Sequence, residues 1–350
     1  MHAEGRLPLL HAHRDGRPRP RLVRPGKGAA AAAPRRRRLA EPLPARLGRA
    51  AAVVLHWGAK ADTLTCLRSL AGSAVPPTPL VVIDNGTGAL ARAEVAAAAP
   101  GAELLAVPEN LGFAGGANLG IRHALAADAD FVLLLNNDAT VEPGCLGELV
   151  RTARGRERVA AVGAKVLAAD DPGRLWAAYG RLTYRAALVE LVGHGEPDGP
   201  RFAAVEEVDW VPGCAMLLAR TALEEVGLLD ERFFAYHEDV DWCTSARARG
   251  FRVLFAPQAR ALHRGGASLA PHGHASPVRY LSARNTVLFA RKHARAREWG
   301  RLALTVTASL PFEYVRRSRR GEGRAVRLLL RGYLDGLLGR DLPHRALGLR

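Results

Sequence analysis

The sequence is poor in cysteine, with 4 in 350 residues, and none of the four lies in a paired spacing. Widely separated cysteines argue against a zinc site and a disulfide framework, and they are typical of a reducing cytoplasm. Long hydrophobic runs are also missing, because no uninterrupted apolar segment reaches the ~18 residues that a membrane span needs. The N-terminus has no apolar segment of the kind a secretory signal contains. We therefore expect a cytoplasmic protein without a membrane-spanning helix.

The net charge of +16 is concentrated at the two ends of the chain. Residues 1–50 and residues 285–350 each carry a net charge of +10, whereas residues 51–284 carry −4. A nucleic-acid-binding domain more often has a basic face within its fold, so the acidic middle argues against nucleic acid as a partner. A basic terminal segment suits an anionic membrane surface equally well.

Composition divides the chain into three parts. Residues 1–48 consist mainly of Pro, Arg and Ala, and such a segment buries too little apolar surface to offset its ordering entropy. We predict that this tail is disordered. Residues 49–268 alternate apolar and polar segments and form the main domain, while residues 269–350 are basic and, beyond Tyr280, helical.

The main domain begins with a regular alternation of short strands and helices. The predicted strands are 51–55, 80–83, 104–107 and 131–135, and the predicted helices between them are 62–70, 89–99 and 117–127. This alternation predicts a parallel α/β sheet. Ligands bind at the carboxyl ends of the strands in such sheets, and three of these four strands end in polar, turn-forming residues. Further strands are predicted at 159–162, 215–218 and 251–255, with helices at 221–226 and 240–249.

Two of the polar strand ends offer ligand-binding oxygens. Asp84 ends the second strand, where a carboxylate can accept a hydrogen bond from a pyrimidine N3–H or a ribose hydroxyl. Asn136, Asn137 and Asp138 follow the fourth strand, and hard divalent cations prefer such carboxylate and amide oxygens, with a diphosphate to complete the shell. Taken alone, each segment is equally consistent with a plain turn.

The segment 109–118 is glycine-rich and opens a helix. Glycine permits a close approach of the backbone, and amides at a helix N-terminus can bind an anion. The spacing differs from G-x-G-x-x-G and does not follow the first strand, so a dinucleotide-dependent dehydrogenase is poorly supported. A bare structural turn is the alternative. The candidate ligand-binding residues in this segment are Asn110, Gly112, Gly115, Gly116 and Asn118.

Three carboxylates lie within four residues at a predicted helix start: Glu238, Asp239 and Asp241. Carboxylates this close repel one another unless a cation or the helix dipole offsets their charge. A solvated acidic turn is the alternative, although the aromatic neighbours argue against full solvation. His263 lies in an apolar, strand-like context, where a lone histidine is more often structural than a metal ligand.

The order and spacing of these segments resemble the motif series of the family 2 inverting glycosyltransferases with the GT-A fold. The resemblance runs from about residue 52 to 268 and is most specific in ENLGFAGGANLGI, in LLLNNDATVEPGCL, and in the stretch from WVPGCAMLL to QARALH. Within the family it is closest to the bacterial rhamnosyltransferase and galactofuranosyltransferase branch. It implies an α/β GT-A sandwich with a mostly parallel central sheet, followed by the C-terminal helical segment.

The resemblance also implies roles for individual residues. Asp239 matches the general base, and Glu238 beside it would orient the acceptor. Asp138 matches the last carboxylate of the metal-binding motif, and His263 matches a histidine that completes the metal shell in some members. Asp84 matches the nucleoside-binding acid, and the sugar-nucleotide donor would also contact Asn136, Asn137 and the candidate residues of segment 109–118. The acceptor side of the pocket falls on Trp210, Pro212 and Gly213.

Two positions depart from the family pattern. Asn136 stands first in the acidic motif, so the first ligand to a metal would be an amide oxygen. Residues 56–58 read His-Trp-Gly where many members have a Tyr-Asn or Asn-Asn pair, in a region that contacts the nucleotide.

The implied reaction is transfer of a sugar from a nucleotide-diphosphate donor, a UDP- or dTDP-sugar with dTDP-rhamnose among them, to a hydroxyl of a cell-surface glycan or lipid-linked acceptor, with inversion. A divalent cation, Mg²⁺ or Mn²⁺, would stabilise the leaving diphosphate, and Asp239 would take the acceptor proton. A non-catalytic nucleotide-sugar or carbohydrate-binding protein on the same fold is the alternative.

The C-terminal segment allows two interpretations. Leu302–Leu310 is apolar and lies between two clusters of basic residues. This segment either belongs to a solvated helical pair that packs on the main domain, or holds the enzyme peripherally on the anionic inner face of the plasma membrane. We favour the membrane contact.

Overall fold

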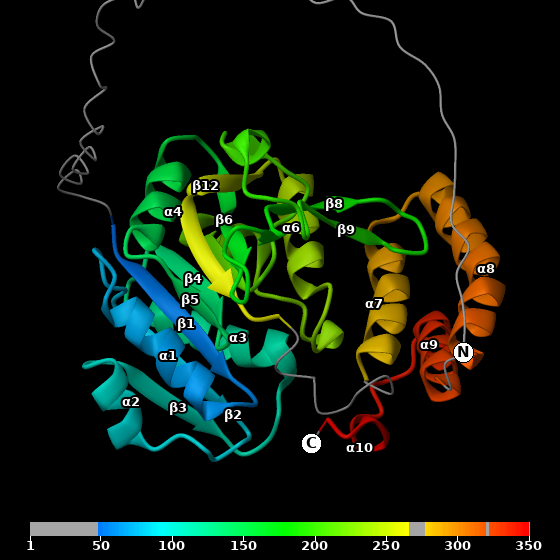
Figure 1. Ribbon diagram of the computed structural model, residues 1–350, viewed down its shortest axis with the longest axis horizontal. Coiled ribbons are helices and arrows are strands. Elements are labelled where there is room, and N and C mark those ends of the chain that lie inside the picture. The colour runs from blue at the N-terminus through cyan, green and yellow to red at the C-terminus, as the bar shows by residue number, and fades with distance from the viewer. Residues whose placement is uncertain (1–47, 266–276, 320–321, 350) are drawn as a thin grey trace, which may run out of the picture. The chain divides into compact units, whose positions relative to one another are not determined.

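The computed structural model describes residues 48–265, 277–319 and 322–349 (Figure 1). The chain separates into two units, residues 1–42 and 43–350, and everything below concerns the second. Apart from Gly48, the tail predicted to be disordered lies outside the described residues. The predicted boundary at residue 268 also lies outside them.

The first half of the sheet is parallel, as predicted. Its strands lie in the order β3-β2-β1-β4, and every neighbouring pair is parallel. β1 and β2 are buried along their whole length, as expected of parallel strands that helices cover on both faces. The strands are β1 (Ala50–His56), β2 (Leu80–Asn85), β3 (Glu103–Val107) and β4 (Phe131–Asn136). The helices between them are α1 (Lys60–Ala71), α2 (Arg92–Ala98) and α3 (Gly112–Ala126).

After β3 the chain crosses back over the sheet and forms β4 on the other side of β1. This change in the order of the strands separates the helices into two layers. Right-handed connections place α1 and α2 on one face of the sheet and α3 on the other. α3 packs on β1 and β2, and α1 packs against β1 and α2. The carboxyl ends of β1, β2 and β4 lie side by side, because His56 pairs with Asp84 and Leu55 with Asn136.

The second half of the sheet is mixed and continues beyond β4 in the order β11-β6-β12-β10. β11 is antiparallel to both neighbours, and β12 is parallel to β6. These strands are β6 (Val159–Ala168), β10 (Glu206–Glu207), β11 (Ala215–Ala219) and β12 (Arg252–His263), with β5 (Ala139–Val141) paired to β12 and β7 (Leu175–Ala177) paired to β6. The predicted strand 251–255 and the strand-like segment that contains His263 are therefore parts of one strand, β12. Its antiparallel pairing with β5 sets His263 opposite Ala139.

The remaining elements surround this sheet. β8 (Tyr179–Leu182) and β9 (Val189–Val192) form a separate hairpin. The further helices are α4 (Cys145–Arg154), α5 (Arg220–Val226), α6 (Glu238–Ala248), α7 (Val278–His293), α8 (Ala296–Ser318), α9 (Gly323–Leu338) and α10 (His344–Leu347). No helix in the described ranges is long and apolar enough to cross a membrane. The four cysteines are buried and free, as their spacing predicts.

The C-terminal helices form a group beside the sheet domain (Figure 1). α9 packs closely on α7 through two glycines: a Cβ added at Gly332 would lie 2.4 Å from the carbonyl oxygen of Tyr280, and one at Gly336 would lie 2.9 Å from that of Arg284. α8 packs in turn on α9. The backbones of α7 and α9 can approach this closely only because both positions lack a side chain.

Candidate active site

One cavity of about 470 Å³ collects most of the predicted site residues. The carboxyl ends of β1 and β4, the start of α3, the loop before β11, the start of α6 and the end of β12 all contribute to its lining. The predicted residues that line it are Asn110, Gly112, Asn136, Asn137, Asp138, Trp210, Pro212, Gly213, Glu238, Asp239 and His263. Of the described residues predicted to bind the donor, Asp84, Gly115, Gly116 and Asn118 lie outside this lining.

Asp138 and His263 meet inside the cavity, although 125 residues separate them in the sequence. The Oδ1 atom of Asp138 lies 3.0 Å from Nε2 of His263, and both side chains are buried. The side-chain amide nitrogen of Asn136 lies 3.3 Å from the same Nε2. The ring of His263 packs edge-on against Trp176, with centroids 4.5 Å apart. These contacts fix a carboxylate, an imidazole and an amide at one point.

These side chains could hold a divalent cation whose remaining ligands come from bound phosphate and water. Among the residues that the structure describes, no group of three or more His, Cys, Asp or Glu side chains could hold a metal ion. The protein therefore offers Asp138 and His263, with the Asn136 amide beside them. Divalent cations at nucleotide sites commonly take one or two protein ligands and complete the shell with phosphate oxygens and water.

Asp239 lies in the first turn of α6 and is held by backbone amides. Its Oδ2 accepts from the amide of Gly213 at 2.9 Å, and its Oδ1 accepts from the amide of Val240 at 2.8 Å. Burial raises the pKa of Asp239, and these amides offset part of that effect, so that its pKa remains above the ordinary value. A carboxylate fixed in orientation and with a raised pKa is suited to accept a proton.

The two neighbouring carboxylates have different environments. Glu238 is buried, and its Oε2 has no hydrogen-bond partner among the described residues. Burial and then the charge of Asp239 raise the pKa of Glu238 well above its ordinary value. Asp241 is buried against α7, where Lys292 Nζ and His293 Nε2 both lie 2.7 Å from its carboxylate. The alternative of a solvated acidic turn is therefore wrong.

The chain enters α6 through an unusual backbone. Phe234, Tyr236 and His237 have φ angles of 64°, 72° and 71°. Non-glycine residues rarely adopt this region, and such strain persists only where surrounding contacts impose it. Here the contacts come from Asn285 of α7, which is fully buried and which the sequence pattern did not single out. Its amide donates to the carbonyl oxygens of Phe233, Ala235 and Tyr236 at 2.8, 2.9 and 2.7 Å.

The same segment contacts the start of α3. The amide of Ala114 donates to the carbonyl of Phe234 at 3.1 Å. A Cβ added at Gly112 would lie 2.5 Å from Phe234, and Gly112 itself has a φ of +73°. Gly112 is therefore required by both its conformation and the close approach of Phe234. These contacts with Phe234 connect the start of α3 to the segment that precedes α6.

Asp84 lies at the end of β2 as predicted, but its carboxylate faces its own loop. It accepts from the hydroxyl and amide of Thr87 and from the amides of Gly88 and Leu90. Burial raises the pKa of Asp84, but the hydrogen bonds from Thr87 and Leu90 lower it by more, so that it lies below its ordinary value. Asp84 thus fixes the loop that follows β2.

Asn85, which was not predicted, lines the cavity beside Asp84. Its Nδ2 donates to Asn110 Oδ1 at 3.0 Å, and its Oδ1 accepts from the amide of Leu111 at 3.0 Å. Asn85 therefore connects the end of β2 to the segment that opens α3. Asn85 directly follows Asp84 at the polar end of the strand, and this position was the signal for it in the sequence.

The glycine-rich segment differs from the prediction, because α3 begins at Gly112 and not at Ala117. A Cβ at Gly116 would lie 2.3 Å from Leu55 of β1, and one at Gly120 would lie 2.3 Å from Val53. Gly116 and Gly120 therefore let the helix pack closely on the sheet. Gly115 lies within α3, outside the cavity lining. Asn118 uses its amide to hold the backbone of Leu229 and the carboxylate of Glu231.

One part of the cavity lining is aromatic and apolar. Trp210 lies flat against Gly180 of β8, where any Cβ would overlap the indole. The β8–β9 hairpin adds Val189 and Leu191 to the lining, and Trp176 completes this wall. The sequence does not point to Val189 and Leu191 because the hairpin has no strong strand pattern, and no motif includes Trp176 of β7. An apolar wall of this kind is suited to a sugar ring or a lipid-linked acceptor.

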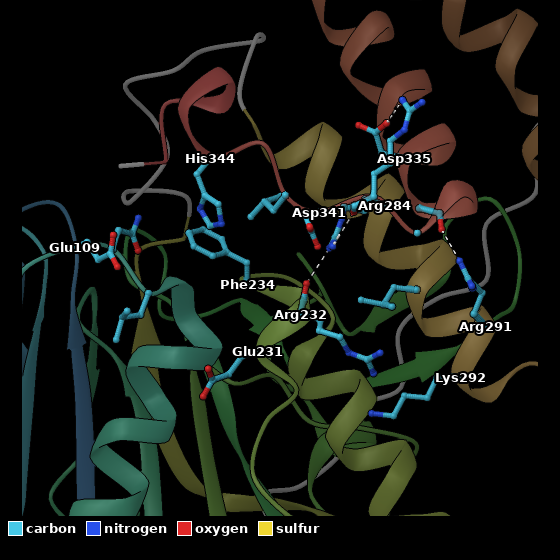
Figure 2. Close-up of a pocket in the computed structure, with 17 residues that line it drawn as sticks. Glu109, Glu231, Arg232, Phe234, Arg284, Arg291, Lys292, Asp335, Asp341 and His344 are labelled. Atoms are coloured by element: carbon cyan, nitrogen blue, oxygen red, sulfur yellow. Dashed lines mark hydrogen bonds and ion pairs between the residues drawn. The ribbon is translucent and has the colours of Figure 1, made fainter.

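A second cavity, of about 950 Å³, lies where the 231–234 segment meets the C-terminal helices (Figure 2). It shares Asn110 and Phe234 with the first cavity. Figure 2 shows Arg284 reaching the carbonyl oxygen of Arg232, a hydrogen bond of 2.8 Å. Arg284 and Asn285 are consecutive on α7, and both hold backbone carbonyls of the segment that precedes α6. α7 thus supports the segment that leads into α6.

The mixed α/β sheet, with a cavity at the carboxyl ends of its parallel strands, is the arrangement found in glycosyltransferases of the GT-A type. The chain belongs to the glycosyltransferase-like family 2, whose family model matches residues 48–320. The family predicted from the sequence is thereby confirmed.

Two curated relatives illustrate the similarity. The N-acetylglucosaminyl-diphospho-decaprenol L-rhamnosyltransferase of Mycobacterium tuberculosis is 27% identical over 216 residues, which are 56% of this chain and 70% of the relative. The galactofuranosyltransferase GlfT1 of the same organism is 32% identical over 173 residues, which are 47% of this chain and 53% of that protein.

Two solved structures share the fold. GalNAc-T7, solved with UDP, GalNAc and Mn²⁺, matches with a TM-score of 0.54 at 13% identity over 71% of this chain, and the match spans about half (48%) of the GalNAc-T7 chain. The mannosyltransferase PcManGT of Pyrobaculum calidifontis, solved with GDP-Man and Mn²⁺, matches with a TM-score of 0.51 at 16% identity, over 84% of this chain and 88% of that one.

Proposed function

We propose that the protein transfers a sugar from a nucleotide-diphosphate donor to a hydroxyl of a glycan or lipid-linked acceptor, with inversion at the anomeric carbon. The observation that carries this proposal is the shared cavity: Asp239, oriented by two amides, lines the same space as the Asp138–His263 pair. A base for the acceptor and a site for the diphosphate are both required for such a transfer, and both are available there.

Asp138 and His263, with the Asn136 amide, would hold a divalent cation, Mg²⁺ or Mn²⁺, whose charge stabilises the departing diphosphate. The Mn²⁺ present in the structures of GalNAc-T7 and PcManGT supports this choice of group. On the nucleotide side we propose Asn110, Gly112, Asn136 and Asn137 as donor contacts, with Asn85 and Trp57 added. Asp84 acts by fixing the loop after β2, and Gly115, Gly116 and Asn118 act by fixing α3.

Asp239 accepts the proton of the acceptor hydroxyl as that oxygen forms the new glycosidic bond. Burial and the charge of Asp239 raise the pKa of Glu238 and so favour its protonated form, which can donate a hydrogen bond to a sugar oxygen. Trp210, Pro212 and Gly213 lie beside these two carboxyls and form the acceptor side. The two adjacent carboxyls thus have different roles: Asp239 accepts a proton, and Glu238 orients the acceptor.

The donor and acceptor classes follow from the relatives. The name of the rhamnosyltransferase relative states a lipid-diphosphate acceptor, and GlfT1 is named for transfer of galactofuranose. We propose a UDP- or dTDP-sugar donor, dTDP-rhamnose among the first to test. An acceptor in cell-surface glycan synthesis, and a peripheral position on the inner face of a membrane, belong to the same proposal.

The test is a panel of UDP-, dTDP- and GDP-sugars, assayed with Mn²⁺, Mg²⁺ or EDTA. We expect one nucleotide class to raise Tm in the presence of metal and to be hydrolysed slowly, with hydrolysis lost in EDTA. Stabilisation without any turnover, with acceptors supplied, would instead favour the non-catalytic binding protein. No stabilisation by any member of the panel would contradict both.

A further inference from the structure

Exposed large apolar side chains gather on α8 and α9. Apart from Val205, all such side chains in the described part of the chain lie on these two helices. On α8 they are 46–71% exposed: Leu304, Phe312, Tyr314 and Val315. On α9 they are 45–58% exposed: Leu330, Leu334, Leu337 and Leu338. Exposed apolar side chains gathered on two helices that pack together point to an interaction surface.

The four leucines of α9 share one face of the helix, because they recur at the spacing i, i+4, i+7 and i+8. The opposite face, which contains Gly332 and Gly336, is the one that packs on α7. The leucine face therefore points away from the helix that supports the active site. We refer to this face, together with the exposed apolar residues of α8, as the α8–α9 surface.

Positive charge accompanies these apolar side chains. Arg297, Arg324 and Arg327 are exposed and have no carboxylate partner among the described residues. Residues 285–350 carry a net charge of +10, against −4 for residues 51–284. Leucines that insert among acyl chains, with arginines that extend to the phosphates beside them, are the pattern of a helix lying on an anionic bilayer.

We propose that the α8–α9 surface binds an anionic lipid bilayer and so holds the active site beside a membrane. This inference deepens the peripheral location proposed above, on which it rests. Its test measures lipid binding without sugar transfer, so that failure of the surface and failure of the enzymatic function are distinguished.

The experiment is co-sedimentation of the full chain with phosphatidylcholine vesicles, with or without phosphatidylglycerol. We expect binding to the anionic vesicles only, weakened by added salt. Leu334→Asp with Leu337→Asp should lower the affinity tenfold or more, and Arg324→Glu with Arg327→Glu should lower it by roughly tenfold or more. The matched controls are Val205→Asp and Arg92→Glu, which change exposed residues elsewhere and should bind like the wild type.

Three results would overturn the proposal. The first is equal binding to neutral and anionic vesicles, or binding to neither. The second is wild-type affinity in both double variants, provided that their circular dichroism shows the native fold. The third is a dimer, seen by light scattering, that Leu334→Asp with Leu337→Asp dissociates, because the surface would then join two copies of the chain.

A different observation carries a second inference, which concerns Asn285. Its three hydrogen bonds go to the segment 233–236, whose backbone is strained and which leads directly into Glu238 and Asp239. Ala114 and Arg284 also bond this segment or the residue before it, but Asn285 alone bonds three of its carbonyl oxygens, so its loss should relax the strained conformation. We infer that Asn285 is a positioning residue, which acts through this backbone to set the direction of the Asp239 carboxylate.

The test compares Asn285→Ala and the near-isosteric Asn285→Asp with Thr286→Val, a change at a buried neighbour on α7. With rates corrected for the folded fraction, both Asn285 variants should lose roughly tenfold to a hundredfold in kcat, with donor KM unchanged. The acid limb of the kcat/KM profile should also shift, because the amides that hold Asp239 would move. Thr286→Val should change neither.

A loss in kcat that disappears after correction for folding, or an equal loss in Thr286→Val, would make Asn285 merely structural. This inference rests on Asp239 as the base. Asp239→Asn is therefore assayed in parallel, and if that variant keeps wild-type turnover, it is the proposed mechanism that fails.

Discussion

At the scale of single residues, the acidic cluster owes its chemistry to three different surroundings. Asp239 has two backbone amides, Glu238 has a buried oxygen with no partner among the described residues, and Asp241 has Lys292 and His293. The sequence shows three equivalent carboxylates. In the proposed mechanism these surroundings make Asp239 the base, Glu238 the group that orients the acceptor, and Asp241 an anchor to α7.

Asp239→Asn should lower kcat by roughly a hundredfold or more while leaving donor binding intact, because the swap is nearly isosteric and removes only the proton acceptor. Asp138→Ala should instead weaken the binding of metal and donor. Steady-state kinetics, with calorimetric titration of the nucleotide sugar, separate the two effects. Near wild-type turnover of Asp239→Asn with saturating substrates would move the base to another residue.

The pH profile should report the raised pKa of Asp239. Activity requires the ionised carboxylate, so kcat/KM should fall as pH drops through that pKa. Because burial raises the pKa, we expect this acid limb at a higher pH than an ordinary aspartate would give. An acid limb at the ordinary aspartate position would show that Asp239 is well solvated in the working enzyme.

Glu238→Gln should stabilise the protein, increasingly so at higher pH. A carboxyl whose pKa is raised by folding binds its proton more tightly in the folded state, so it lowers stability as pH rises from its unfolded to its folded pKa. The Tm advantage of the variant should therefore grow as the pH rises above 4.5, the ordinary glutamate pKa, while its activity falls. A Tm difference independent of pH would contradict the assigned ionisation.

At the scale of elements, α7 connects the active site to the C-terminal helices. One side of it holds the 232–236 backbone through Arg284 and Asn285, and Lys292 and His293 near its end hold Asp241. Another side accepts α9 at Gly332 and Gly336. The family model, which extends to residue 320, accordingly includes α7.

Gly332→Ala should destabilise the packing of α9 on α7. The added Cβ would lie 2.4 Å from a backbone carbonyl, which cannot move without shifting α7, so a loss of about 1–3 kcal/mol is expected. Gly300→Ala in α8 is the matched control, because its Cβ would have nothing within 4 Å. That change should stabilise by about 0.5–1 kcal/mol through helix propensity. Urea unfolding measures both, and equal effects would contradict the close packing.

At the scale of the whole molecule, the uneven charge separates the roles of the parts. The region of the sheet and the cavity is slightly acidic, and the two ends carry the basic excess. A nucleotide-sugar site needs only local positive charge from a cation, whereas contact with an anionic surface gains from every exposed arginine. The distribution of charge is therefore consistent with catalysis in one part and attachment in another.

Deletion of residues 1–48 should leave Tm and turnover nearly unchanged, because their composition cannot build a core. Thermal unfolding and the donor-hydrolysis assay, run on the full and shortened chains, provide the check. A collapse of either quantity would show that the tail packs on the domain or binds a substrate.

The sequence by itself determined the alternation of strands and helices, the family, and the segments that reach the cavity, because buried strands and polar strand ends are local patterns. It could not determine that Asp84 faces its own loop, that Gly116 and Gly120 serve helix packing, or that Asn285 holds the entry to α6. Those roles depend on which backbone lies opposite each side chain. Only the tertiary structure decided them, since contacts between residues as distant as Asp138 and His263 arise from strand register and not from sequence spacing.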